Sequence, residues 1–288
     1  MIMSNYASAT VPTQTIEADG IRFSYRRLSE GTGVPVVLTN HFMGNLDTYD
    51  PAILDGLAAT RDVITFDNAG VGSSTGEPKS TIADIAADAY TFIRALGLDR
   101  IDLIGHSMGG HVAQQVAFAH PELVRKLILI GTAPRGGAPG DPSDGAAGFF
   151  AQHPNLHDEF WLPIFFSASD ASQAAGRRYL ERIRARADRD VPFSDEAVAT
   201  YSAARVDWAT IAPDSFDYLR EISAPALVVN GSHDIVIPTI NSYTLQQNIP
   251  NAKLLLYPDS GHGVHFEYPE DFLREAINFL DRDFVVGY

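Results

Sequence analysis

Cysteine is absent from the 288 residues of the sequence. Disulfide bonds, thiolate metal sites and a cysteine nucleophile are therefore excluded. No run approaches the ~18 consecutive apolar residues of a membrane-spanning helix. Residues 1–14 contain no Lys or Arg, and no apolar stretch long enough for a signal peptide. We therefore expect a cytoplasmic protein.

Basic residues are scarce in this chain. Lys and Arg together number 21, against 36 Asp and Glu, which gives a formal net charge of −15. An acidic surface repels phosphate backbones and anionic lipids, so we expect neither nucleic acid nor a membrane as a partner. The expected partner is a small-molecule substrate, and both a monomer and a homodimer remain open.

Short apolar runs recur along the chain and predict strands. They are almost continuously apolar rather than alternating, as in parallel sheets that are buried on both faces. The segment 14–28 predicts an antiparallel hairpin that turns near Asp19 and Gly20. The other predicted strands are 34–39, 63–66, 101–104, 126–130, 226–229 and 253–257.

Helical patterns lie between these runs. The segment 81–96 has apolar residues at helical spacing, with Thr81 as the expected N-cap and Gly97 at the C-terminal end. Further helices are predicted over 108–119 and 270–280. Strands that alternate with helices predict an α/β fold, a mostly parallel doubly wound sheet with helices on both faces.

The rhythm of strands and helices breaks between residues 133 and 223. A stretch rich in Gly and Pro is followed by a mostly helical segment that carries many aromatic residues. We expect this segment to be a helical lid inserted into a core formed by residues 1–132 and 224–288. The alternative is a set of ordinary helices that cover the sheet.

Residues 105–110 read Gly-His-Ser-Met-Gly-Gly, directly after a predicted strand and at the start of a helix. A Gly-x-Ser-x-Gly sequence in this context predicts a nucleophile elbow. The turn is so tight that side chains at Gly105 and Gly109 would clash. Ser107 would then stand at a helix N-terminus, which favours developing negative charge.

A serine nucleophile requires a base, usually a His that a carboxylate orients. The expected chain order is serine, acid, histidine. Asp234 follows the predicted strand 226–229, and His262 follows the last strand in a Ser-Gly-His-Gly loop. His265 competes for the role of base, but the tight loop favours His262.

An oxyanion hole needs two backbone N–H donors near the nucleophile. The residue after the serine, Met108, supplies the first in our prediction. Met43 supplies the second, with Phe42 as the alternative, from the loop after the strand 34–39. We expect His41 to brace this loop. The predicted pocket-lining residues are Phe42, His41, Phe149, Phe150, Trp161 and Phe165.

The elbow, the acid after an Asn-Gly pair, the Gly-His-Gly loop and the segment 67–74 together resemble the α/β-hydrolase superfamily, over nearly the whole chain. The segment 67–74 differs from the usual motif by Ala69 in the place of Arg, which removes a structural salt bridge. Phe42 stands where many members carry Gly. The resemblance implies an α/β-hydrolase fold with a variable lid and a reaction that needs no metal or organic cofactor.

Ser107 rather than Asp at the elbow excludes the relatives that cleave carbon–halogen bonds or epoxides. The resemblance therefore implies a serine hydrolase that cleaves a carboxylic ester, or a related acyl bond, of a small hydrophobic substrate. A carbon–carbon hydrolase, a lactonase or a cofactor-free perhydrolase (haloperoxidase-like) could use the same triad. A non-catalytic small-molecule receptor on this fold is a further alternative.

Overall fold

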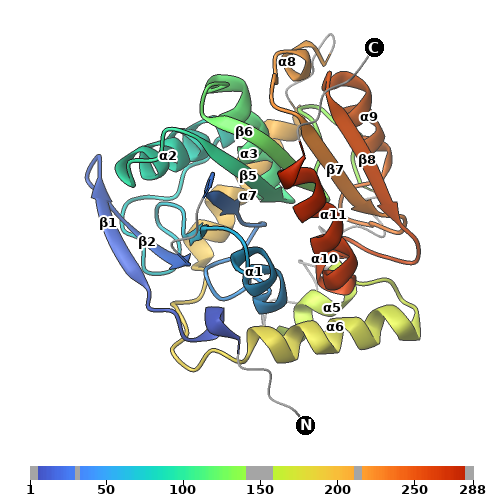
Figure 1. Ribbon diagram of the computed structural model, residues 1–288, viewed down its shortest axis with the longest axis horizontal. Coiled ribbons are helices and arrows are strands. Elements are labelled where there is room, and N and C mark those ends of the chain that lie inside the picture. Colours follow the sequence, from blue (N-terminus) through green and yellow to red (C-terminus); the bar gives the residue numbers. More distant parts are fainter. Residues whose placement is uncertain (1–5, 30–32, 141–157, 211–215, 283–288) are drawn as a thin grey trace.

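An eight-stranded sheet forms the centre of the molecule (Figure 1). The computed structural model describes residues 6–29, 33–140, 158–210 and 216–282. The strand order is β1-β2-β4-β3-β5-β6-β7-β8; β1 and β2 are antiparallel and the other six strands are parallel to one another. The strands are β1 Gln14–Ala18, β2 Ile21–Leu28, β3 Val36–Thr39, β4 Val63–Phe66, β5 Ile101–His106, β6 Val124–Ile130, β7 Ala226–Gly231 and β8 Ala252–Tyr257.

The first two strands form the hairpin that the sequence predicts. Ala18 pairs with Ile21 across a two-residue turn. Asp19 and Gly20 both have positive φ, 47° and 77°, as a type I′ turn requires. The register of this edge of the sheet is therefore set by local turn chemistry.

The strands bury one set of side chains on each face of the sheet. Val37, Ile64 and Leu103 belong to one core cluster, whereas the neighbouring Val36 and Ile104 belong to the other. Helices α2 (Ile82–Ala95) and α3 (Met108–Ala119) cover the first face. Helices α1 (Pro51–Ala58) and α11 (Pro269–Asp281) cover the second. This confirms the predicted doubly wound sheet.

Helix α2 begins and ends where its sequence predicts. The Thr81 side chain accepts a hydrogen bond from the Asp84 N–H at 3.1 Å, which satisfies one of the free donors of the first turn. Gly97 follows the helix with φ +74°, the left-handed conformation that commonly ends a helix. The apolar stripe of α2, which includes Phe92 and Ile93, is buried.

Between β6 and β7, the described part of the chain contains helices and no strand. In Figure 1, α5 and α6 lie next to α10 (Val264–Glu267) at one end of the sheet. Their large apolar side chains join the core rather than face solvent. The division of the chain into a core and a lid stays a prediction. These helices are η2 Asp158–Phe160, α5 Trp161–Phe165, α6 Asp170–Ile183, α7 Asp195–Thr210 and α8 Asp217–Arg220.

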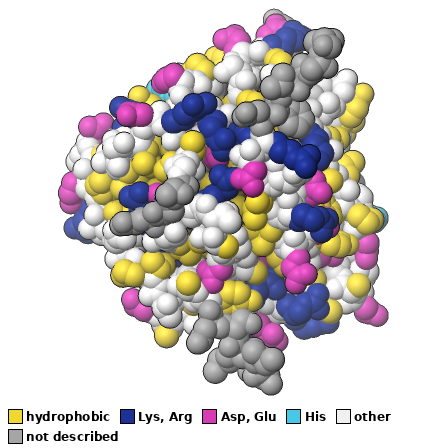
Figure 2. Space-filling view, viewed as in Figure 1, with side chains coloured by type: hydrophobic (Ala, Val, Ile, Leu, Met, Phe, Trp, Pro, Cys, Tyr) yellow, Lys and Arg dark blue, Asp and Glu magenta, His cyan; other side chains and the backbone are white. Residues whose placement is uncertain are grey.

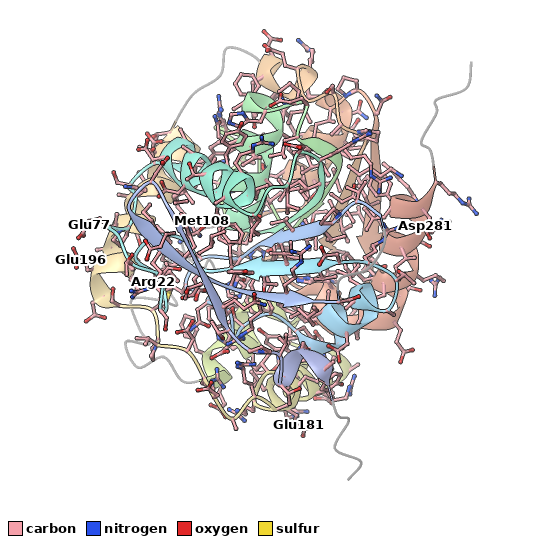
Figure 3. All side chains as sticks on the ribbon, turned by 60° about the vertical axis from the view of Figure 1, so that its left-hand side comes forward. Arg22, Glu77, Met108, Glu181, Glu196 and Asp281 are labelled. Atoms are coloured by element: carbon pink, nitrogen blue, oxygen red, sulfur yellow. The ribbon has the colours of Figure 1, made fainter. Side chains whose placement is uncertain are left out.

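Two short helices complete the described structure: η1 (Ala7–Ala9), close to α1, and α9 (Ile240–Asn248), between β7 and β8. Within the described residues, no helix is long and apolar enough to cross a membrane. The face shown in Figure 2 carries basic and acidic side chains interspersed. In Figure 3, Glu77, Glu181 and Glu196 lie at the outside of the molecule and Met108 lies inside it.

Candidate active site

Ser107 occupies a sharp turn between β5 and α3. Its backbone has φ 55° and ψ −120°, a conformation that residues other than glycine rarely adopt and that costs about 1–3 kcal/mol. The turn is held on both sides, because the Ser107 N–H donates to the Ile130 carbonyl at 2.9 Å and the Thr132 hydroxyl donates to the Ser107 carbonyl at 2.9 Å. The Ser107 side chain makes no capping hydrogen bond to α3, so its hydroxyl is available for chemistry.

Three glycines make this turn possible. A Cβ at Gly105 would lie 2.4 Å from the Gly109 carbonyl oxygen, which confirms the predicted clash. A Cβ at Gly109 would lie 2.2 Å from the carbonyl oxygen of Thr39 in β3, and one at Gly110 would lie 2.5 Å from Thr132. The glycines therefore allow α3 to approach neighbouring strands, in addition to relieving crowding inside the elbow.

Asp234 and His262 meet in a buried hydrogen bond. The distance from His262 Nδ1 to Asp234 Oδ2 is 2.8 Å, and both side chains are almost fully buried. The other carboxylate oxygen accepts hydrogen bonds from the N–H groups of Val236 and Ile237, each at 2.9 Å. This fixes the carboxylate and engages Nδ1, so Nε2 is the nitrogen of His262 that can exchange a proton with a substrate or a nucleophile.

Ser107 and His262 line the same small pocket, which is partly open to solvent. The hydrogen bonds of the described residues do not include a direct one between these two side chains. Hydrogen bonds between catalytic groups are often long before substrate binds. The structure thus brings the three predicted triad residues to one end of the sheet.

The loop that carries His262 packs against α5. The Gly263 N–H donates to the Phe165 carbonyl at 2.7 Å. A Cβ at Gly261 would lie 2.7 Å from that carbonyl oxygen, and one at Gly263 would lie 2.6 Å from the Phe165 Cβ. The two glycines beside His262 are therefore required for the main chain of the loop to contact the inserted helices.

Three further imidazoles surround His262. The His106 ring donates from Nε2 to the His262 carbonyl at 3.0 Å, so it supports the main chain of the base. Burial lowers the pKa of His41 to about 4 and the pKa values of His106 and His265 well below the usual range. These three rings are neutral near pH 7, and among the residues that the structure describes none of them has a carboxylate partner. The structure thus supports His262 over His265 as the base.

The loop after β3 is braced by Asn40, a residue that the sequence did not single out. Its amide donates to the Asn45 carbonyl and to the Thr48 hydroxyl, both at 2.8 Å, and its oxygen accepts from the His41 N–H at 2.9 Å. The His41 ring contacts the Phe42 carbonyl at 2.9 Å, which confirms the predicted bracing. In the sequence, only the position of Asn40 next to His41 could have indicated this role.

Within this loop, Gly44 N–H donates to the His41 carbonyl at 3.0 Å and closes a turn. Met43, at the third position, has φ 63°, as a type II turn requires. Among the described residues we find no acceptor for the N–H of Met43 or of Met108. Phe42, rather than Met43, is among the residues that line the pocket.

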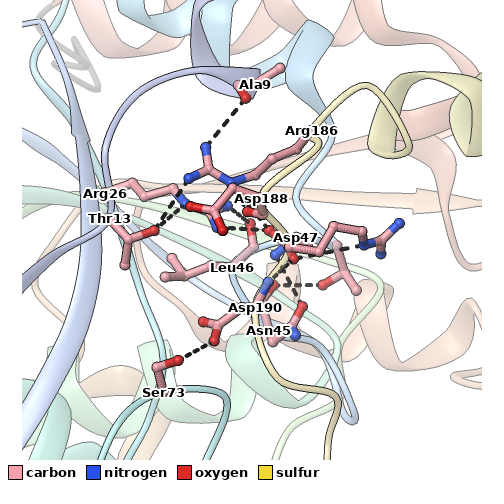
Figure 4. A network of polar contacts seen from close by, with 12 residues as sticks. Ala9, Thr13, Arg26, Asn45, Leu46, Asp47, Ser73, Arg186, Asp188 and Asp190 are labelled. Atoms are coloured by element: carbon pink, nitrogen blue, oxygen red, sulfur yellow. Dashed lines mark hydrogen bonds and ion pairs between the residues drawn. The ribbon is translucent and has the colours of Figure 1, made fainter.

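A buried polar network ties the same loop to the inserted helices (Figure 4). Asp47 forms an ion pair with Arg26 at 2.7 Å and accepts from the Asp190 N–H at 2.5 Å. The Leu46 N–H donates to Asp67 at 2.8 Å, and its carbonyl accepts from Arg26 at 2.8 Å. The loop after β3 is thus held by a buried ion pair whose arginine, Arg26, comes from β2.

The pocket wall is mostly apolar and aromatic. Of the six residues predicted to line the substrate pocket, four line this pocket, and Phe149 and Phe150 lie outside the described residues. Sequence reasoning missed three residues of the wall: Ile164, Val236 and Arg205. No group of three or more possible metal ligands occurs in the described residues. The lining residues are His41, Phe42, Ser107, Trp161, Ile164, Phe165, Arg205, Val236 and His262.

Comparison with known proteins identifies the family. Residues 34–269 match the family model described as alpha/beta hydrolase fold. The chain is similar to 2-hydroxymuconate semialdehyde hydrolase from Pseudomonas putida, with 29% identity over 87% of this chain and 88% of that protein.

Two solved structures show the same architecture. An alpha/beta hydrolase fold protein from Chitinophaga pinensis has 38% identity and a TM-score of 0.89, over 96% of this chain and 99% of that chain. Est816, described as an N-acyl homoserine lactone degrading enzyme, has 27% identity and a TM-score of 0.71, over 92% and 100% of the two chains. The chain therefore belongs to the α/β-hydrolase family and is a hydrolase on that fold.

Proposed function

We propose that this protein is a serine hydrolase that cleaves a carboxylic ester, or a related acyl bond, of a small hydrophobic substrate. One observation carries the proposal. Ser107, in a strained turn, shares a pocket with His262, and the buried carboxylate of Asp234 holds the Nδ1 of that histidine. A hydroxyl, an imidazole and a carboxylate in this order form the general-base arrangement of serine hydrolases.

In the proposed reaction, His262 Nε2 takes the proton of the Ser107 hydroxyl as the oxygen attacks the carbonyl carbon. Asp234 stabilises the resulting imidazolium. His262 then gives the proton to the departing alcohol, which leaves an acyl-enzyme. A water molecule, deprotonated by His262, attacks this ester and releases the acid.

The developing oxyanion requires two N–H donors. Met108, the residue after the nucleophile, supplies the first in this proposal, and its position at the start of α3 adds the favourable end of the helix dipole. Met43 supplies the second. The presence of Phe42 in the pocket wall supports the alternative, in which the Phe42 N–H is the second donor.

Substrate preference follows from the pocket wall. The Trp161 and Phe165 rings stack with centroids 4.9 Å apart, and Phe165 also lies 6.0 Å from the ring of His262. Aromatic surface next to the base favours an apolar substrate. We propose that the segment 133–223 acts as the lid over this pocket.

A Ser107→Ala variant tests the nucleophile. With 4-nitrophenyl butyrate as substrate, we expect kcat to fall by about 10⁶-fold, because the serine and histidine of a triad act as one unit. Ser80→Ala, which alters an exposed serine, is the matched control and should retain full activity. A fluorophosphonate probe should label Ser107 in the native protein. Full activity of Ser107→Ala would contradict the proposal, and absence of both turnover and labelling would favour the receptor.

A substrate panel separates the reactions that share a triad. The names of two relatives give the first candidates, an N-acyl homoserine lactone and 2-hydroxymuconate semialdehyde. A peroxide-dependent assay covers the perhydrolase alternative. If one of these compounds has a kcat/KM far above every simple ester, it replaces the ester as the proposed substrate, with the same three residues in the same roles.

A further inference from the structure

A cationic side chain lies in the wall of the proposed active site. Arg205 belongs to α7 and lines the same pocket as Ser107 and His262. Its guanidinium carbon lies 4.7 Å from the centroid of the Phe42 ring. Arg205 therefore stands beside the loop after β3, on which the second oxyanion donor is proposed.

Arg205 has no anionic partner within the described residues. No ion pair or hydrogen bond of its guanidinium is found there, although the chain contains 36 acidic residues. Other buried or partly buried arginines are paired: Arg26 with Asp47, Arg125 with Asp102 and Arg182 with Asp50. Burial lowers the pKa of Arg205. Within the described part of the chain, the positive charge of Arg205 in this pocket is thus uncompensated.

The contact with Phe42 offsets only part of this cost. A cation over an aromatic face is attracted to it, but among the described residues the half-buried guanidinium has no acceptor for its five N–H donors. Buried charges in proteins are ordinarily paired. An apolar residue of the same length would pack on Phe42 without the desolvation penalty. The charge is therefore explained by a ligand that brings its own anion.

We propose that Arg205 binds a carboxylate of the substrate, so that the enzyme acts on acyl compounds that have an apolar body and a free acid group distant from the scissile bond. This inference rests on the proposed function. Arg is suited to the role because its planar fork can donate two parallel hydrogen bonds to a carboxylate. The aromatic wall would contact the body of the substrate, between the acid group and the carbonyl that Ser107 attacks.

Paired esters test the proposal. Mono-4-nitrophenyl adipate, suberate and sebacate present a carboxylate at three distances from the scissile ester. Their methyl esters have the same chains without the charge. We expect the wild-type kcat/KM for the best of the three acids to exceed that for its methyl ester by about tenfold or more, as a charge-assisted hydrogen bond supports.

Arg205→Met keeps an apolar side chain of similar reach and removes the charge. We expect it to lower kcat/KM for the acid by about 10- to 100-fold, and to leave that for the methyl ester within about threefold, a factor worth under 1 kcal/mol. Arg205→Lys should retain part of the preference. Arg135→Met is the matched control, because Arg135 also lies over aromatic rings, among them Trp208 at 5.1 Å, but does not line this pocket. It should leave the ratio of the two rates unchanged.

Two results would overturn the inference: wild-type protein without preference for any acid, or an Arg205→Met variant that loses activity on both esters alike. The second result would assign Arg205 a packing role. If the wild type hydrolyses neither ester, the proposed function fails, and calorimetric titration with monomethyl suberate still tests Arg205. Binding that Arg205→Met weakens at least tenfold supports the inference without turnover, and equal binding contradicts it.

Discussion

The loops of the sheet and the helices between β6 and β7 both line one pocket. The loops contribute mainly through their main chain, and the helices contribute through their side chains. In the sheet loops, main-chain contacts position Ser107 and His262, at glycines where no Cβ fits. In the inserted helices, the side chains of Trp161, Phe165 and Arg205 face the pocket. The comparison indicates that the chemistry depends on backbone geometry and that substrate choice depends on side chains that can be exchanged.

The largest expected effect concerns the sheet loops. Asp234→Asn keeps the shape of the side chain but removes the charge that orients His262 and stabilises its cation. We expect kcat on 4-nitrophenyl butyrate to fall by about 10⁴-fold, as for the equivalent change in other triads. Asp99→Asn, at an exposed carboxylate, should have no effect. A loss below tenfold would show that Asp234 is not the acid of the triad.

The second prediction separates steric from conformational demands on glycine. Gly109→Ala places a Cβ 2.2 Å from the Thr39 carbonyl oxygen, and we expect it to lower the free energy of unfolding by about 3 kcal/mol or more. Gly97→Ala meets no atom within 4 Å but has φ +74°, so about 1–2 kcal/mol is expected. Urea unfolding measures both. Equal losses would mean that the contact with β3 is not what excludes a side chain at residue 109.

The third and smallest effect concerns a contact between α3 and α7. His111 of α3 stacks on Trp208 of α7, with ring centroids 5.2 Å apart, and burial lowers its pKa to about 3. The unfolded chain binds a proton at His111 more readily than the folded chain does. The contribution of neutral His111 to the free energy of unfolding is therefore complete above about pH 6.5 and is lost as the pH falls toward 3. Between about pH 7.5 and about pH 5.5 the loss is about 1.4 kcal/mol.

His111→Phe removes this titration and keeps the stacking. The variant should therefore lose about 1.4 kcal/mol less stability than the wild type over the same pH range. Urea unfolding at the two pH values measures the difference. If the two proteins lose equal stability, His111 does not contribute to the acid sensitivity of the protein's stability.

The core of the fold could be predicted from the sequence because its signals are local. Apolar runs marked the strands to within two residues at their starts, and the predicted helix 108–119 is α3. The candidate triad was also accessible, because Ser107, Asp234 and His262 each follow a strand, and parallel strands bring their ends to one edge. Gly105 carried a sequence signal for the same reason, since its clash lies within the elbow.

The contacts made by the helices between β6 and β7 could not be predicted in this way. Arg205 looks in sequence like any surface cation on a helix. Its role depends on a contact with Phe42, which is 163 positions away (205 − 42). Asn40 and His106 were missed for the same reason, because their partners are main-chain groups that the fold brings near. The sequence pattern of a single segment carries no information about such contacts between distant residues.

The contact between the His262 loop and α5 has a consequence for engineering. The Phe165 carbonyl accepts the Gly263 N–H, and the main chains touch where neither Gly261 nor Gly263 leaves room for a side chain. A chimera that receives these helices from another hydrolase would lose activity unless the donor's own histidine loop came with them. The helix and the loop are therefore one transplantable unit, although Phe165 and Gly263 lie 98 positions apart in the sequence.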